Sequence, residues 1–211
     1  MLMVRSRIRG RALNRHFRFV ALLAATMLPA DAYSGGWSLD DARSEWGRFT
    51  LGVASGIVAH ELGHYVVATS KGFKVSHDGL SIVYPGATFT DAEQLQVASA
   101  GFQTQWLLTE LILRDQSGKE RKEPPGNFGA GMVCAHLGIT LAYLVYLKDH
   151  KQGDIVAMAD ATGYSRNQIA LALAIPAALD AWRLFGTQVP EWVPQLSLLN
   201  KGLGIAWVWT Y

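Results

Sequence analysis

The chain has 211 residues, half of them hydrophobic and only 17% charged, and its mean hydropathy is +0.13. This composition excludes a disordered or low-complexity chain and favours a membrane protein, while the length fits a single domain. The one cysteine, Cys134, excludes an internal disulfide and a cysteine-based zinc cluster. Any metal ion must therefore bind to histidine, aspartate or glutamate.

The formal net charge of +2 originates at the N-terminus, because the chain from residue 33 onward carries more acidic than basic residues. That balance excludes a basic nucleic-acid-binding surface. Arginines in the first 18 positions precede an apolar run at 19–30 and a small-x-small pattern at 30–32, which predicts a bacterial-type export signal over residues 1–32. An uncleaved signal anchor and an organellar presequence remain the alternatives. The arginines are Arg5, Arg7, Arg9, Arg11, Arg15 and Arg18.

Residues 49–70 form the first long apolar segment after the signal, with Glu61 as their only formally charged side chain. As a helix this segment is about 33 Å long, enough to cross the hydrocarbon core of a bilayer. Residues 73–90 alternate in polarity and contain Asp-Gly and Pro-Gly pairs, which predict short strands in a hairpin or meander.

Residues 91–113 again have helical character, although Glu110 and several glutamines make them a poor lipid-facing span. Residues 128–147 carry no formal charge and are the clearest transmembrane candidate. A polar loop at 148–166 leads to a further apolar segment at 167–186. We therefore expect residues 33–211 to form one multi-pass, mainly α-helical membrane bundle with a short β hairpin or meander. The tail ends in aromatic residues that suit a headgroup boundary or ordinary packing: Trp207, Trp209 and Tyr211.

The first apolar segment contains His60-Glu61-Leu62-Gly63-His64, an HExxH motif. On a helix His60 and His64 lie one turn apart on the same face and can hold one zinc ion, while Glu61 can act as general base toward a water molecule. The alternative is a pair of core histidines with Glu61 on a solvated face. Three ionisable groups in an otherwise uncharged, membrane-length helix favour the functional interpretation.

Catalytic zinc usually has three protein ligands, so the sequence must supply a third. Asp180 is the candidate we favour, because it lies within an apolar helical segment. Its alternative role is an ion pair with Arg183, one turn away. Glu93 and Glu110 are gluzincin-like candidates on the next helix, and His136 is a reserve ligand whose alternative is a hydrogen bond across helices.

These residues together resemble the site-2 protease family of intramembrane zinc metalloproteases. His60 and His64 match the family's first two zinc ligands, Glu61 its catalytic base, residues 73–90 its β-rich excursion, and Leu179-Asp180 the later element that supplies its third ligand. Ala181 stands where the family has glycine. The resemblance covers about residues 49–186 and implies a multi-pass bundle with Zn²⁺ held by His60, His64 and Asp180.

Residues 100–105, Ala-Gly-Phe-Gln-Thr-Gln, are similar to the family's Ala-Gly-Pro-x-x-Asn segment. Gln105 could donate a hydrogen bond to a developing oxyanion or hold substrate backbone. The alternative is a small-residue contact between two helices.

The resemblance implies a zinc-dependent endopeptidase of the bacterial inner membrane that cleaves membrane-bound or membrane-proximal proteins. Residues 73–90 could bind an extended substrate by strand addition. Two alternatives remain: an exported soluble zincin, and a non-catalytic membrane protein with a structural or sensory metal site.

Overall fold

The computed structural model describes residues 36–78, 81–114 and 124–211. These residues form a mainly helical chain with one two-stranded antiparallel sheet, which confirms the expected combination of helices and a β hairpin. The predicted export signal at 1–32 lies outside the described residues. The elements in chain order are α2 (Leu39–Ser44), α3 (Trp46–Ser70), β1 (Ser76–Asp78), β2 (Ser81–Val83), α4 (Asp91–Leu113), α5 (Asn127–Val145), the 3-10 turn η1 (Leu147–Asp149), α6 (Asp154–Thr162), α7 (Arg166–Phe185) and α8 (Trp192–Thr210).

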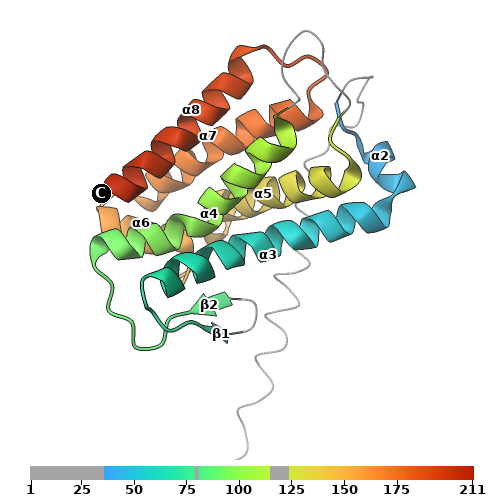
Figure 1. Ribbon diagram of the computed structural model, residues 1–211. Coiled ribbons are helices and arrows are strands. Elements are labelled where there is room, and N and C mark those ends of the chain that lie inside the picture. Colours follow the sequence, from blue (N-terminus) through green and yellow to red (C-terminus); the bar gives the residue numbers. More distant parts are fainter. Residues whose placement is uncertain (1–35, 79–80, 115–123) are drawn as a thin grey trace, which may run out of the picture.

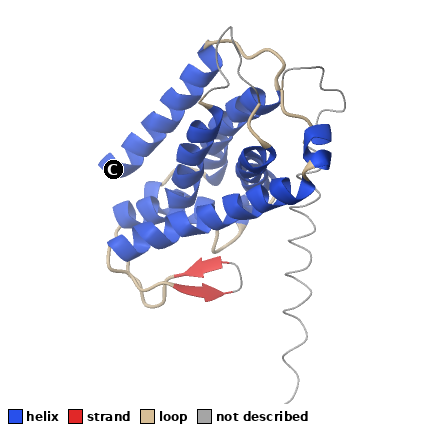
Figure 2. Cartoon of the chain, turned by 45° about the vertical axis from the view of Figure 1, so that its right-hand side comes forward, coloured by secondary structure: helices blue, strands red, loops and turns tan. Residues whose placement is uncertain are grey.

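Five long helices make a bundle, and the β hairpin lies outside it beside α3 (Figures 1 and 2). Helix α5 packs against both α3 and α7, which share no extensive contact with each other. Helix α4 packs against α3, α5, α6 and α8. The short helix α6 is thereby held next to α4, close to the end of α3 from which the hairpin departs.

Local sequence signals fix several helix starts. Thr90 accepts a hydrogen bond from the backbone of Glu93, whose side chain accepts one from the backbone of Thr90, and this capping box begins α4. Ser38 and Ser165 begin α2 and α7 in the same way. Helix α6 ends at Gly163, whose φ of 72° places it in the left-handed conformation that glycine adopts without strain.

Glycines let α3 approach its neighbours closely. A Cβ at Gly52 or at Gly131 would collide with backbone across the α3–α5 contact. A Cβ at Gly63 would collide with the Thr104 hydroxyl and the Ala100 carbonyl of α4. The glycine of the HExxH motif therefore seats the histidine face of α3 directly against α4.

The structure adds three helices to the sequence prediction, α2, α6 and α8, and the six-residue α2 lies before the first predicted helix. Helix α6 lies inside the segment 148–166, which we expected to be a polar loop, because nine residues are too few to produce a clear apolar period. Helix α8 occupies the tail, where Pro194 falls within the first helical turn, a position that tolerates proline.

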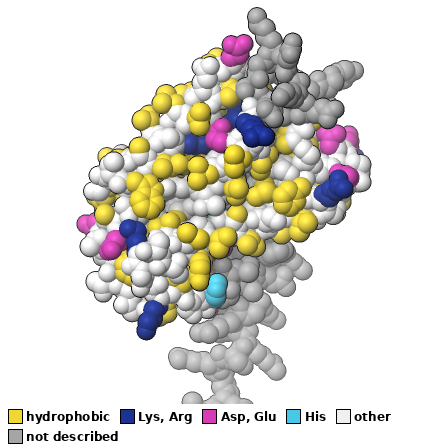
Figure 3. All heavy atoms as spheres, viewed as in Figure 1, with side chains coloured by type: hydrophobic (Ala, Val, Ile, Leu, Met, Phe, Trp, Pro, Cys, Tyr) yellow, Lys and Arg dark blue, Asp and Glu magenta, His cyan; other side chains and the backbone are white. Residues whose placement is uncertain are grey.

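Two of the described helices, α5 and α7, are long and apolar enough to cross a membrane. Helix α3, although 25 residues long, does not have the mean hydropathy of a span. Hydrophobic side chains are nevertheless spread over the face seen in Figure 3, with charged ones in a few small groups. Exposed leucines and valines of α3 and α8 contribute to this apolar exterior: Leu51, Val58, Leu62, Val66, Leu198, Leu199 and Leu203.

Candidate metal centre

Helix α3 turns both motif histidines toward the interior. His60 and His64 are 3% and 4% exposed, and their Nε2 atoms lie 3.2 Å apart. Nδ1 of His64 lies 2.7 Å from the carbonyl oxygen of Val97, which can only accept a hydrogen bond, so Nδ1 carries the proton. In neutral His64 the lone pair is therefore on Nε2, the atom that faces His60.

The third group at this point is Asp154, the first residue of α6. Its Oδ2 atom lies 3.2 Å from Nε2 of His60 and 3.4 Å from Nε2 of His64. These three residues, which we call the histidine cluster, are the one group of this kind among the described residues whose ligand atoms come close enough to hold a metal ion.

The spacing of the histidine cluster can be compared with the requirement of zinc. For ligands about 2.0–2.1 Å from a tetrahedral zinc ion, the ligand atoms are about 3.3 Å from one another. The three separations of 3.2, 3.2 and 3.4 Å agree with that value. Two imidazole nitrogens and one carboxylate oxygen are also a donor set that zinc commonly takes. The residues present could therefore hold a zinc ion.

Helix α4 leaves room beside the histidine nitrogens because residue 101 is glycine. A Cβ at Gly101 would lie 2.5 Å from Nε2 of His64 and 2.6 Å from Nε2 of His60. Any larger residue would fill the space that these nitrogens face.

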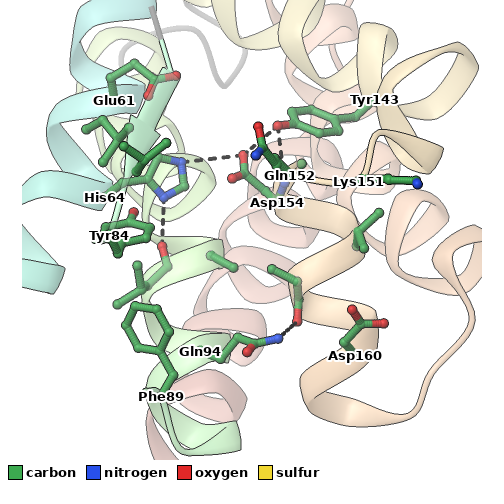
Figure 4. Close-up of a pocket in the computed structure, with 17 residues that line it drawn as sticks. Glu61, His64, Tyr84, Phe89, Gln94, Tyr143, Lys151, Gln152, Asp154 and Asp160 are labelled. Atoms are coloured by element: carbon green, nitrogen blue, oxygen red, sulfur yellow. Dashed lines mark hydrogen bonds and ion pairs between the residues drawn. The ribbon is translucent and has the colours of Figure 1, made fainter. Parts of the chain in front are cut away.

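A cavity of about 420 Å³ opens beside the histidine cluster, between β2, α4 and α6. Glu61, His64, Tyr143 and Asp154 line it, and Figure 4 shows their side chains around this pocket. The hairpin contributes the apolar residue Ile82. Other apolar lining residues are Val83, Phe89, Val97, Ala98, Val156 and Ala157. Glu61 thus borders the same cavity as two of the metal-binding candidates.

Charge within the pocket shifts the pKa of two lining groups outside the long helices. Burial by itself raises the pKa of Asp154. The positive charge of His64 and the hydrogen bonds to both histidines lower this pKa by a larger amount, so the resulting pKa is well below the usual range. Burial, Asp154 and Glu61 all raise the pKa of Tyr84. Asp154 is therefore a carboxylate, and Tyr84 keeps its proton.

The structure places Asp180, the expected third ligand, in a different group. Asp180 is fully buried and lies 2.6 Å from the Lys201 ammonium and 3.2 Å from the Arg183 guanidinium, and Glu110 bonds to the same two cations. We call these four residues the ionic cluster. Asp180 does not reach the histidine cluster because α7 packs against α5 and makes no extensive contact with α3. The alternative reading of Asp180, an ion pair with Arg183, is the one the structure shows.

The reserve candidates also lie away from the two histidines. Nδ1 of His136 is 3.4 Å from Oε1 of Gln105, and its Nε2 is 3.8 Å from Asp180. Gln105 is buried against His136 and does not line the pocket. Glu110 belongs to the ionic cluster, and Glu93 is held in the capping box of α4.

Sequence reasoning missed Asp154 because the search for a third ligand was confined to acids in long apolar segments. The available signal was local: Gly153-Asp154 is followed by Ile-Val-Ala-Met-Ala and then by Gly163, a pattern typical of a short helix that begins at the aspartate.

No protein-family model matches this chain, and no curated protein or solved structure shows significant similarity to it.

Proposed function

We propose that this chain is a zinc-dependent endopeptidase that acts within or at the surface of a membrane. The observation that carries the proposal is the near-tetrahedral spacing of His60, His64 and Asp154 beside a cavity that Glu61 also lines. A zinc ion bound there would polarise the scissile carbonyl and lower the pKa of a water molecule to about 7.

Each residue of the site has a defined task in this proposal. His60, His64 and Asp154 bind the metal through Nε2, Nε2 and Oδ2. Glu61 accepts a proton from the attacking water and passes it to the nitrogen of the leaving amine. The hairpin lies at the mouth of the same cavity, where β2 could pair with an extended substrate segment.

The membrane location is supported by the distribution of polarity. Large apolar side chains of α3 and α8 face outward, while Asp180, Arg183 and Lys201 are at most 2% exposed. An apolar exterior around paired interior charges is the arrangement a bilayer favours. Together with the two span-length helices α5 and α7, this distribution supports association with a membrane, and multi-pass insertion in a bacterial inner membrane is part of the proposal. Retention in the membrane pellet after alkaline carbonate extraction is the expected result, and release into the supernatant would favour a soluble zincin.

The central test compares Glu61→Gln with wild-type protein in detergent, using fluorescein-labelled casein and internally quenched peptides as probes. We expect Glu61→Gln to bind zinc stoichiometrically and to hydrolyse the probes about 10²–10⁴-fold more slowly. The matched control is Glu191→Gln, an exposed glutamate outside the pocket. Wild-type protein that binds zinc but cleaves none of the probes would favour the third possibility, a structural or sensory metal site.

A further inference from the structure

Tyr143 of α5 places its hydroxyl at the edge of the histidine cluster. The hydroxyl donates a hydrogen bond of 2.8 Å to Oδ2 of Asp154, the same atom that faces both histidines. Figure 4 shows Asp154 between His64 and Tyr143. The backbone N–H of Asp154 lies 3.4 Å from the Tyr143 oxygen and donates back to it. Tyr143 therefore holds both the backbone and the side chain of Asp154.

Asp154 has few other constraints. It is the first residue of a nine-residue helix whose N-cap, Gly153, provides no side-chain hydrogen bond. Within the described parts of the chain, the carboxylate is contacted by hydrogen-bonding side chains from His60, His64 and Tyr143. A metal ion bound to the cluster would replace the direct histidine contacts. Tyr143 would then be the remaining side chain that fixes the rotamer of Asp154.

The tyrosine ring is itself firmly placed. It packs edge-on against Phe102, with ring centroids 5.4 Å apart, and Phe102 packs edge-on against His60 at 5.1 Å. A Cβ at Gly153 would lie 3.4 Å from the Tyr143 ring and 3.1 Å from the carbonyl oxygen of His150. The start of α6 therefore lies close to the tyrosine ring, and a Cβ at Gly153 would make only ordinary van der Waals contact with it.

From this geometry we infer that Tyr143 is a positioning residue that orients Asp154 as the third metal ligand. The inference rests on the proposed metal site and deepens it. Tyr143 thereby links α5 to both elements that carry the ligands. It contacts α6 directly, at Asp154. It contacts α3 indirectly, because its ring packs on Phe102 of α4, which packs on His60. A hydrogen-bonded partner of this kind around a metal ligand commonly changes metal affinity by about 10–100-fold.

The test is the zinc affinity of Tyr143→Phe, measured in the 211-residue chain by competition with a chromophoric chelator. The substitution keeps the ring and its packing but removes the hydrogen bond to Asp154. We expect zinc to bind about 10–100-fold more weakly. Tyr164→Phe is the matched control, because that tyrosine is 51% exposed and its ring packs on Trp207 rather than on the site. We expect its affinity to equal that of wild type.

Two further readouts separate positioning from a general structural effect. The visible absorption spectrum of the Co²⁺-loaded protein should change in Tyr143→Phe and should equal that of wild type in Tyr164→Phe. In an Asp154→Ala background, adding Tyr143→Phe should have no further effect on zinc affinity, because the group being positioned is gone. Equal zinc affinities of wild type and Tyr143→Phe would overturn the inference, as would an effect that persists in the Asp154→Ala background.

Failure of this inference and failure of the proposed function are distinguishable. Zinc-binding protein without hydrolysis of any probe contradicts the peptidase proposal but leaves the effect of Tyr143→Phe measurable. A wild-type chain that binds neither Zn²⁺ nor Co²⁺ contradicts both.

Discussion

Asp154 and Asp180 are both largely removed from solvent, yet their surroundings differ in kind. Oδ2 of Asp154 faces two imidazoles and one tyrosine hydroxyl, next to an open cavity. Both oxygens of Asp180 bond to permanently charged or hydroxyl donors, Lys201, Arg183 and Ser197, in the closed interior. One carboxylate is surrounded by groups that can share a metal ion, and the other is already neutralised.

This contrast shows what makes a buried acid available as a ligand. Among the described residues of the ionic cluster, two carboxylates, Glu110 and Asp180, face two cations, so their charges balance without a metal ion. A divalent cation placed there would be repelled by Lys201 and Arg183. In the histidine cluster one carboxylate faces two groups that are neutral metal ligands once deprotonated. An acid in an apolar helix is therefore a good ligand candidate only when no lysine or arginine has paired with it.

The largest expected effect is on stability, from Asp180→Asn. The substitution removes a carboxylate that both Lys201 and Arg183 contact, and removing one member of a buried ion-pair network typically lowers the free energy of unfolding by about 3–5 kcal/mol. Zinc bound per folded molecule should be unchanged. Denaturation in detergent and metal analysis measure the two quantities. Loss of zinc at unchanged stability would return Asp180 to the position of third ligand.

The opposite pattern is expected for Asp154→Asn. Zinc affinity should fall by more than the roughly 100-fold that loss of a supporting hydrogen bond can cause, because a ligand itself is weakened. The unfolding midpoint of the metal-free protein should change much less than in Asp180→Asn. Inductively coupled plasma analysis after dialysis gives the zinc content. Stoichiometric zinc in this variant would remove Asp154 from the site.

Gly101→Ala tests the room beside the histidine nitrogens. The added methyl group would lie about where these nitrogens point, and overpacking of this kind costs about 1–3 kcal/mol. We expect that cost to appear mainly as weaker zinc binding. Gly138→Ala is the control, because a Cβ there meets nothing within 4 Å and the helix interior gains about 0.5–1 kcal/mol. Equal zinc affinities in the two variants would contradict the assignment.

The smallest effect is expected from Glu110→Gln. Glu110 bonds to the same cations as Asp180, but its side chain is 20% exposed whereas that of Asp180 is fully buried. Water can therefore replace part of the hydrogen bonding that the two cations lose, and the free energy of unfolding should fall by about 1–2 kcal/mol. If Glu110→Gln lowered the free energy of unfolding as much as Asp180→Asn, the difference in burial between the two acids would not determine their contribution to stability.

Much of the fold could be read along the chain. The segment 91–113 was predicted with the bounds that α4 has, and the predicted helices at 49–70, 128–147 and 167–186 correspond to α3, α5 and α7 within a few residues. The turn residues at 78–79 predicted a hairpin, which β1 and β2 form. These features depend on local periodicity and capping, which the sequence contains. Helices α2, α6 and α8 were missed because a short or aromatic-rich segment leaves a weak period.

The two histidines and Glu61 could be placed by sequence alone, because their geometry depends only on the pitch of one helix. The third member of the cluster could not, since it comes from an element 90 residues further along the chain. The sequence offered several acids of suitable chemistry, and which one lies near His60 and His64 depends on how α5, α6 and α7 pack. Packing puts α5 between α3 and α7, pairs Asp180 with Lys201 and Arg183, and brings the start of α6 to the histidines. Helical spacing is encoded locally, whereas the partner of a buried charge is chosen by the tertiary contacts that bury it.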